Sequence, residues 1–225
     1  MMSAESYAEA LTQESHARTQ AYADEMRDGP DPCVDTAALP DDPTIEVYDN
    51  VLSDPQAYRE SALSHPFQTF MVGDIPWHGL AKCQETELAA WLSVTRPDLT
   101  PSLSLFRRSP AGQVEPNFIH TDKSMGDATV IFYLNEHPAD DDGTRFWRHR
   151  WSGATESQSS SVVDAVVEEE AWRDTRQWAL RAHVGGIWNR AVVFPGGYFH
   201  SRAIFENYGE DREARLTQIM FCRKD

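Results

Sequence analysis

The sequence predicts a mostly β fold with flanking helices (α+β), in which short antiparallel strands form a sandwich or barrel. From Ser102 onward, short β-rich runs are separated by turn residues, and most have no helix between them. The composition is that of an ordinary globular domain, because 40% of the 225 residues are hydrophobic and 25% are charged. The β-rich runs are SLSLFRRS, NFIHTD, ATVIFYLN, TRFWRHR, RAVVFPG and RLTQIMFC.

The chain divides into an N-terminal region, residues 1–43, and a domain, residues 44–225, that contains this series of strands. Residues 1–43 are expected to contain a helix rich in Ala, Glu and Gln, followed by an irregular linker rich in Pro and Asp. Residues 44–225 are expected to form the folded domain. There TIEVYDNVL alternates as a strand, and a helix follows with Ser53 as its N-cap and Pro55 near its start. A second helix is expected over residues 85–94.

Residues 151–186 interrupt the strand series and are expected to form a lid-like insertion. Their first part, WSGATESQSSS, is polar and flexible in composition. The part that follows, VVDAVVEEEAWRDTRQWAL, has the apolar spacing of a helix. Several tryptophans lie in and around the insertion, and we expect most of them in the core and a few beside a substrate pocket.

Charge and cysteine content exclude several classes of protein. Acidic residues outnumber basic ones by 36 to 20, a formal net charge of −16 that would repel a nucleic-acid backbone or an anionic membrane. The N-terminus lacks the pattern of a signal peptide, and no run approaches the roughly 20 apolar residues of a membrane span. The three cysteines form no C-x-x-C pair, which favours neither a disulfide framework nor a thiolate zinc site. We therefore expect a soluble cytoplasmic protein without nucleic-acid or membrane partners.

A candidate metal site begins in the run NFIHTD. His120 and Asp122 are two residues apart, so both side chains project from one face of an extended chain. His200 ends the run RAVVFPGGYFH, at a strand terminus from which a side chain can reach a barrel mouth. Two histidines and one carboxylate are the ligand set of non-haem iron(II) oxygenases, although zinc can use the same atoms. The alternative is a turn in which Asp122 caps a neighbouring amide and His120 is half-buried.

Further motifs follow in order along the chain. YLN occupies residues 133–135, GTRF occupies residues 143–146, and Arg215 heads the last strand as R-L-T. With the H-x-D pair and a distal histidine, this order resembles the iron- and 2-oxoglutarate-dependent dioxygenases, in particular their prolyl-hydroxylase-like branch, over roughly residues 102–223. The resemblance implies a double-stranded β-helix, that is a jelly-roll or cupin-like core. It also implies an iron site whose ligands are His120, Asp122 and His200.

The resemblance further implies a site for 2-oxoglutarate. Arg215 becomes the partner of its distal carboxylate, because a guanidinium is a planar fork that can bind a carboxylate through two nitrogens. Thr217, two residues later on the same strand face, and Tyr133 offer hydroxyl groups beside that carboxylate. Arg212 is a rival for the same role, and a surface salt bridge is the alternative role of Arg215. We favour Arg215 because Arg212 lies in the polar turn before the strand.

The function that the resemblance implies is an Fe(II)/2-oxoglutarate-dependent dioxygenase. Such an enzyme hydroxylates or otherwise oxidises a C–H bond, consuming dioxygen (O2) and 2-oxoglutarate and releasing succinate and CO2. Hydroxylation or a related oxidation is expected because Asp122 stands where halogenating relatives have a small residue. The expected substrate is a small molecule, such as an amino acid or a biosynthetic intermediate. The alternatives are a protein or peptide side-chain hydroxylase, an oxygenase without 2-oxoglutarate, and a non-catalytic jelly roll that binds a metal or ligand.

Overall fold

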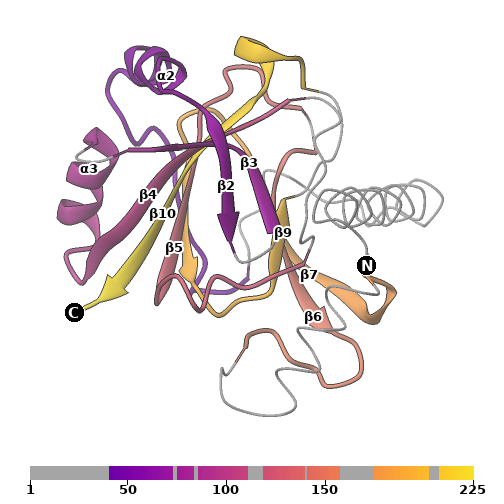
Figure 1. Ribbon diagram of the computed structural model, residues 1–225. Coiled ribbons are helices and arrows are strands. Elements are labelled where there is room, and N and C mark those ends of the chain that lie inside the picture. The colour runs from indigo at the N-terminus through magenta and orange to yellow at the C-terminus, as the bar shows by residue number, and fades with distance from the viewer. Residues whose placement is uncertain are drawn as a thin grey trace.

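The computed structural model describes residues 41–72, 75–83, 86–110, 119–139, 141–157, 175–202 and 208–225. Within these ranges the strands form two antiparallel sheets (Figure 1). The large sheet contains β1 (Glu46–Tyr48), β2 (Gln68–Val72), β3 (Ile75–Lys82), β4 (Leu99–Ser109), β5 (Ala128–Tyr133), β8 (Ala191–Pro195) and β10 (Arg215–Lys224). The small sheet contains β6 (Gly143–His149), β7 (Trp178–Gly185) and β9 (His200–Arg202).

The strand order confirms the predicted jelly-roll core. It is β1-β8-β5-β10-β4-β3-β2 in the large sheet and β7-β6-β9 in the small sheet. Most hydrogen-bonded neighbours are therefore distant in the sequence, as in a double-stranded β-helix, where the chain passes repeatedly from one sheet to the other. The last strand, β10, lies at the centre of the large sheet between β5 and β4.

The two faces of the large sheet have different neighbours. Side chains alternate across β10, so Leu216 and Met220 pack on one face against helices α2 (Pro55–Leu63) and α3 (Glu87–Thr95). The opposite face looks toward the small sheet, and Tyr133 there packs in one cluster with Phe146 of β6. Figure 1 shows the helices beside the large sheet and the small sheet away from them. The space between the two sheets is where the candidate site lies.

Both helices begin at a side-chain cap. Asp54 accepts a hydrogen bond from the Ala57 amide (2.9 Å), and Pro55 occupies the first helical position. The helix was predicted here, but the predicted N-cap Ser53 is wrong by one residue. Thr86 caps α3 in the same way, at the start of the second predicted helix. No helix within the described ranges is long and apolar enough to cross a membrane.

Several predicted elements differ from the structure. The helix predicted to run through Leu180 is wrong at its end, because Trp178–Gly185 pairs with β6 as a strand of the small sheet. Of the predicted strand NFIHTD, the described residues 119–122 form no ladder strand, and His120 makes an isolated bridge to His200. Strands β2 and β3 were not predicted. The N-terminal helix and residues 158–174 of the expected lid lie outside the described residues.

Candidate metal centre and the adjoining cavity

The structure brings the three predicted metal ligands together. His120, Asp122 and His200 each offer one ligand atom, and these atoms lie within 4.8 Å of one another. His120 and His200 are joined by two backbone hydrogen bonds of 3.0 and 2.9 Å, which place their side chains next to each other. The Asp122 amide donates to the carbonyl of Gly196 (2.7 Å). A Cβ at Gly196 would lie 2.4 Å from the Gly126 carbonyl oxygen, so this turn needs glycine for so close an approach.

Hydrogen bonds orient the donor atoms. The ring nitrogen Nδ1 of His200 donates to the Tyr198 carbonyl (2.9 Å), because a carbonyl can only accept. The lone pair of His200 is therefore on Nε2, where it can bind a metal. The Nε2 atom lies 3.3 Å from Oδ2 of Asp122. Thr129 donates its hydroxyl proton to the same oxygen (2.8 Å). Partners of this kind hold metal ligands in one orientation and one protonation state.

The electrostatics of the cluster suit a divalent cation. Burial raises the pKa of Asp122, but His200, His120 and the Thr129 hydroxyl outweigh burial and hold that pKa below its usual range. Burial lowers the pKa of His200, but the Asp122 carboxylate outweighs it and raises that pKa above its usual value. Asp122 is therefore ionised near neutral pH. In the described part of the chain no fourth His, Cys, Asp or Glu joins the cluster, so its donor set is that of an open site, as in non-haem iron(II) oxygenases and catalytic zinc sites, rather than of a closed structural zinc site.

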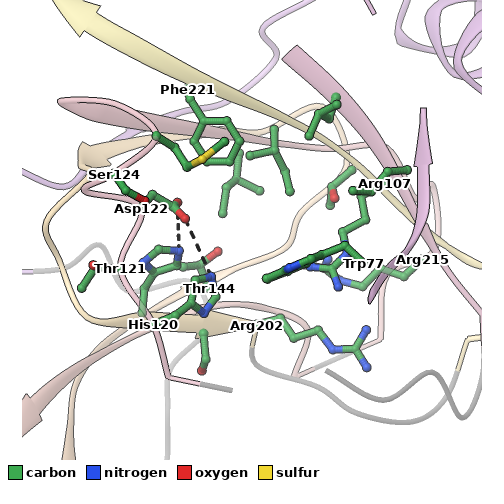
Figure 2. A pocket seen from close by; sticks show the side chains of 18 residues that line it. Trp77, Arg107, His120, Thr121, Asp122, Ser124, Thr144, Arg202, Arg215 and Phe221 are labelled. Carbon is green, nitrogen blue, oxygen red and sulfur yellow. Dashed lines mark ion pairs between the residues drawn. The ribbon is translucent and has the colours of Figure 1, made fainter. Parts of the chain in front are cut away.

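The cluster lines a cavity of about 270 Å³ between the two sheets (Figure 2). One wall is apolar and comes from β3, β4, β5, β10 and the segment after Asp122. A second part of the lining is polar and includes side chains from both sheets. The apolar lining residues are Leu80, Leu105, Met125, Ile131, Ile219 and Phe221, and the polar ones beside the cluster include Thr144, Arg107, Arg202, Arg215 and Thr217.

Arg215, the predicted partner of a carboxylate, is buried in this lining. Its Nε donates to Oδ1 of Asp142 (2.8 Å), and its guanidinium carbon lies 5.7 Å from the centroid of the Tyr133 ring. Burial lowers the pKa of Arg215, but Asp142 outweighs burial and raises it, so the arginine stays charged. Arg212 instead lies on the surface, where its exposed side chain forms an ion pair with Glu60. Of the two rival arginines, Arg215 therefore lies in the cavity lining, whereas Arg212 lies on the surface.

Asp142 was not identified as a site residue from the sequence. Its side chain is buried, and besides Arg215 it accepts hydrogen bonds from the Tyr208 hydroxyl (2.5 Å) and the Gly143 amide (2.6 Å). Gly143 has φ +147°, and a Cβ there would lie 2.0 Å from the Val184 carbonyl oxygen. The glycine of the predicted GTRF turn is therefore required for the chain to place Asp142 beneath Arg215.

The two predicted hydroxyl groups lie in different positions. Thr217 lines the cavity, and its buried Oγ1 has no hydrogen-bond partner among the described residues. Tyr133 does not line the cavity. Its hydroxyl forms a hydrogen bond of 2.7 Å with Thr144 Oγ1. Thr144, the threonine of GTRF, lines the cavity in its place. A ligand in the cavity would therefore contact Tyr133 only through Thr144.

Three further lining residues carry chemistry that sequence reasoning did not identify. They are Trp77 of β3, Arg107 of β4 and Arg202 of β9. The guanidinium carbon of Arg107 lies 5.2 Å from the Trp77 ring centroid, and the Trp77 ring lies edge-on to His120 at 6.2 Å. Trp77 was missed because its strand was not predicted. Arg202 was missed although it follows His200 by two residues, a spacing that places both on one face of a strand.

Several solved structures are similar to this chain at low sequence identity. The non-heme alpha ketoglutarate dependent carbocyclase SnoK from nogalamycin biosynthesis has a TM-score of 0.54 and 12% identity, over 80% of this chain and 79% of that chain. A Trichoplax adhaerens prolyl hydroxylase, solved with a hypoxia inducible factor peptide fragment, has a TM-score of 0.49 and 11% identity over 93% and 90%. A Pseudomonas putida prolyl-4-hydroxylase has a TM-score of 0.44 and 12% identity over 92% and 98%. The likeness to SnoK shows a common fold.

Sequence comparison places the chain in a family. No curated protein matches it. The model of a family of unknown function, DUF6445, matches residues 101–222. That range begins in β4 and ends in β10, so it contains the three clustered donors and the buried arginine. Because the match covers more than half of the 225 residues, the chain belongs to the DUF6445 family.

Proposed function

We propose that this chain is an iron(II)- and 2-oxoglutarate-dependent oxygenase that hydroxylates or otherwise oxidises a C–H bond of a small molecule. The observation that carries the proposal is one cavity with two complementary sites. An open cluster of two histidines and one carboxylate lies on one side of it, and buried Arg215 lines it as well. SnoK, which has the same fold, is itself named as dependent on alpha-ketoglutarate.

Each site residue has a proposed role. His120, Asp122 and His200 hold iron(II) through two imidazole nitrogens and one carboxylate oxygen. When bound there, iron(II) would supply the oxidising chemistry together with dioxygen and 2-oxoglutarate, and 2-oxoglutarate would leave as succinate and CO2. The protein binds and orients the reactants and keeps the donors in the required protonation state, with Thr129 and the Tyr198 carbonyl holding Asp122 and His200.

The proposed 2-oxoglutarate site lies on β10. Nε of Arg215 donates to Asp142. The two terminal guanidinium nitrogens of Arg215 can then bind the distal carboxylate of 2-oxoglutarate. Thr217 supplies the second donor, because its buried hydroxyl otherwise lacks a partner among the described residues. Tyr133 supports the site indirectly by binding the hydroxyl of Thr144.

The cavity volume favours a small substrate. At about 270 Å³ the cavity is slightly smaller than the roughly 300–1,000 Å³ typical of small-molecule sites, and 2-oxoglutarate must occupy part of it. A closed structural metal site is disfavoured, because such sites use a fourth protein ligand and the described residues offer three.

The proposal is tested by adding iron(II) and then 2-oxoglutarate to the metal-free protein without oxygen. The chelate should give a weak visible charge-transfer band. Asp122→Ala should give no band, and Arg215→Leu should require more 2-oxoglutarate to reach the same absorbance. If the protein binds iron(II) but 2-oxoglutarate neither binds nor produces the band, the protein is a metalloprotein that does not use this cosubstrate.

A further inference from the structure

We propose that Asp142 lowers the affinity of the cavity for 2-oxoglutarate and for succinate, because its carboxylate competes with the distal carboxylate of either ligand for Arg215. The inference rests on the proposed function and deepens it, since Asp142 would set how tightly the cosubstrate is held and how readily the product leaves. It starts from the way in which these two buried side chains are paired. Nε of Arg215 donates to Oδ1 of Asp142 (2.8 Å).

A second buried arginine, Arg190, is paired differently. Asp49 accepts hydrogen bonds from Nε and Nη2 of Arg190, at 2.6 and 2.9 Å, and the Gly185 carbonyl accepts one from Nη1 (3.2 Å). All three guanidinium nitrogens of Arg190 therefore have a partner in the protein. Among the described residues, only Nε of Arg215 has a hydrogen-bond partner. Its two terminal nitrogens form the edge of the guanidinium that fits a second carboxylate.

The fold holds Asp142 in place independently of Arg215. Oδ1 also accepts a hydrogen bond from the Gly143 amide (2.6 Å), and Oδ2 accepts one from the Tyr208 hydroxyl (2.5 Å). A Cβ at Gly186 would lie 3.0 Å from Oδ2, so the backbone packs against the carboxylate as well. Asp142 therefore stays beside Arg215 when a ligand carboxylate binds to the terminal nitrogens. The two carboxylates then share one guanidinium.

The charges of this arrangement oppose tight binding. Two negative charges near one guanidinium repel each other, and the repulsion is stronger in a buried site than in water. Asp142 already gives Arg215 a negatively charged partner when no ligand is bound. A ligand carboxylate therefore gains less than it would from a guanidinium whose charge is not compensated. Removing the charge of Asp142 should destabilise the protein without ligand and strengthen the binding of the distal carboxylate.

The competition has its main consequence for the product. Succinate keeps the distal carboxylate of 2-oxoglutarate but lacks the 2-oxo acid group that chelates the metal. The contact with Arg215 is therefore a larger part of the binding of succinate than of 2-oxoglutarate. Because Asp142 weakens this contact, succinate leaves more readily and the next molecule of cosubstrate can bind.

The test measures by calorimetry how 2-oxoglutarate, succinate and 2-oxopentanoate bind to the protein loaded with iron(II), without oxygen. 2-Oxopentanoate is the matched ligand, because it has the same five-carbon 2-oxo acid chain but no distal carboxylate. Asp142→Asn keeps an oxygen that can accept from Nε of Arg215 and removes the negative charge. This variant should bind 2-oxoglutarate and succinate about fivefold or more tightly than the unaltered protein, with the affinity for 2-oxopentanoate changed less than about twofold. If Asp142 only positions Arg215, the variant should bind 2-oxoglutarate equally or more weakly.

Asp49→Asn is the matched control, because it removes the carboxylate of the other arginine pair and neither Asp49 nor Arg190 lines the cavity. It should bind all three ligands as the unaltered protein does. Tyr208→Phe is a second test, which does not depend on whether Asp142→Asn folds. It removes a hydrogen bond from Asp142 and so makes this carboxylate a stronger competitor for Arg215. The variant should bind 2-oxoglutarate about twofold or more weakly and 2-oxopentanoate as before.

Circular dichroism first establishes which variants are folded. The inference is overturned if folded Asp142→Asn binds 2-oxoglutarate and succinate no more tightly than the unaltered protein, or if 2-oxopentanoate gains as much affinity as they do. It is also overturned if Tyr208→Phe leaves the affinity for 2-oxoglutarate unchanged or raises it. Failure of the unaltered protein to bind 2-oxoglutarate is a different result, because it contradicts the proposed function itself.

Discussion

The two sheets that enclose the cavity hold their functional side chains in different ways. On the large sheet, Arg215, Thr217 and Arg107 lie on long strands; Arg215 pairs with β4, and Thr217 pairs with both β4 and β5. On the small sheet, His200 opens a strand of three residues, and His120 joins it through an isolated bridge. The side proposed to bind 2-oxoglutarate is therefore part of a long ladder, whereas the proposed metal-binding side is assembled from short segments.

This difference has a physical consequence. Residues on a long ladder keep their positions because the pairing of many successive residues holds the backbone, so one substitution removes one side chain and little else. The metal cluster depends on few backbone hydrogen bonds and on a glycine contact, so the metal itself should contribute to holding the segments together. Substitutions on the two sides should then have different effects. Those in the metal cluster should cause loss of the metal, and those on the large sheet should weaken the binding of 2-oxoglutarate.

The largest effect is expected on the metal side. His120→Ala and Asp122→Ala should each lower iron(II) affinity by far more than the roughly 10- to 100-fold typical of residues that only orient a ligand. Both variants should therefore be purified without iron and without turnover while remaining folded. Metal analysis and circular dichroism check this. His78→Ala, an exposed histidine on β3, is the control and should retain iron, and stoichiometric iron in both test variants would falsify the ligand assignment.

A large effect on stability is expected when Asp142, the buried partner of Arg215, is replaced. Asp142→Ala removes the partner of a buried guanidinium, which typically costs about 3–5 kcal/mol in the free energy of unfolding. Denaturant unfolding measures this cost, and added 2-oxoglutarate should recover part of it because its carboxylate, on the two terminal nitrogens, again gives the guanidinium a negatively charged partner. Asp98→Ala removes a partly exposed ion pair with Arg96, which solvent screens, and should lower the free energy of unfolding far less. Equal losses in the two variants would mean that Asp142 does not stabilise Arg215.

A smaller effect should separate the two rival arginines. Arg215→Leu should weaken 2-oxoglutarate binding by roughly 10- to 150-fold, which corresponds to about 1.5–3 kcal/mol for a charge-assisted bond. Iron affinity should barely change. Arg212→Leu on the surface should leave the affinity for 2-oxoglutarate nearly unchanged. Anaerobic titration of 2-oxoglutarate into both variants decides between them. If Arg212→Leu weakens the binding and Arg215→Leu does not, the assignment is reversed.

The smallest predicted effect is on pH dependence. Iron(II) must displace the proton of His200, whose pKa is raised by Asp122, so affinity should fall as pH decreases and should begin to fall above the ordinary histidine pKa of 6.5. The limiting slope is about tenfold per pH unit for one displaced proton. Asp122, with its lowered pKa, stays ionised in this range. His183, whose pKa burial lowers to about 4, stays neutral there and does not contribute to the slope.

Measuring iron(II) affinity between about pH 8 and about pH 5 checks this prediction. Arg215→Leu is the matched control and should show the same slope, because Arg215 contacts Asp142 rather than the metal cluster. An affinity independent of pH would contradict the role of His200 as a ligand.

The sequence by itself determined much of the fold and the identity of the clustered donors. Short β-rich runs separated by turn residues predicted β4, β5, β6, β8 and β10. The period of two along a strand placed Arg215 and Thr217 on one face. Spacing also brought His120 and Asp122 to one side of the chain, although no ladder strand forms there.

Only the tertiary structure decided which faces meet across the cavity. The buried role of Asp142, in a run of three aspartates, depends on Arg215, which is 73 residues away in the chain. The pairing of Arg107 with Thr217 and of Arg202 with Thr144 depends in the same way on strands distant in the sequence. Local periodicity specifies the face on which a side chain lies, but the partner of that face is set by non-local strand pairing and packing, which no local pattern encodes.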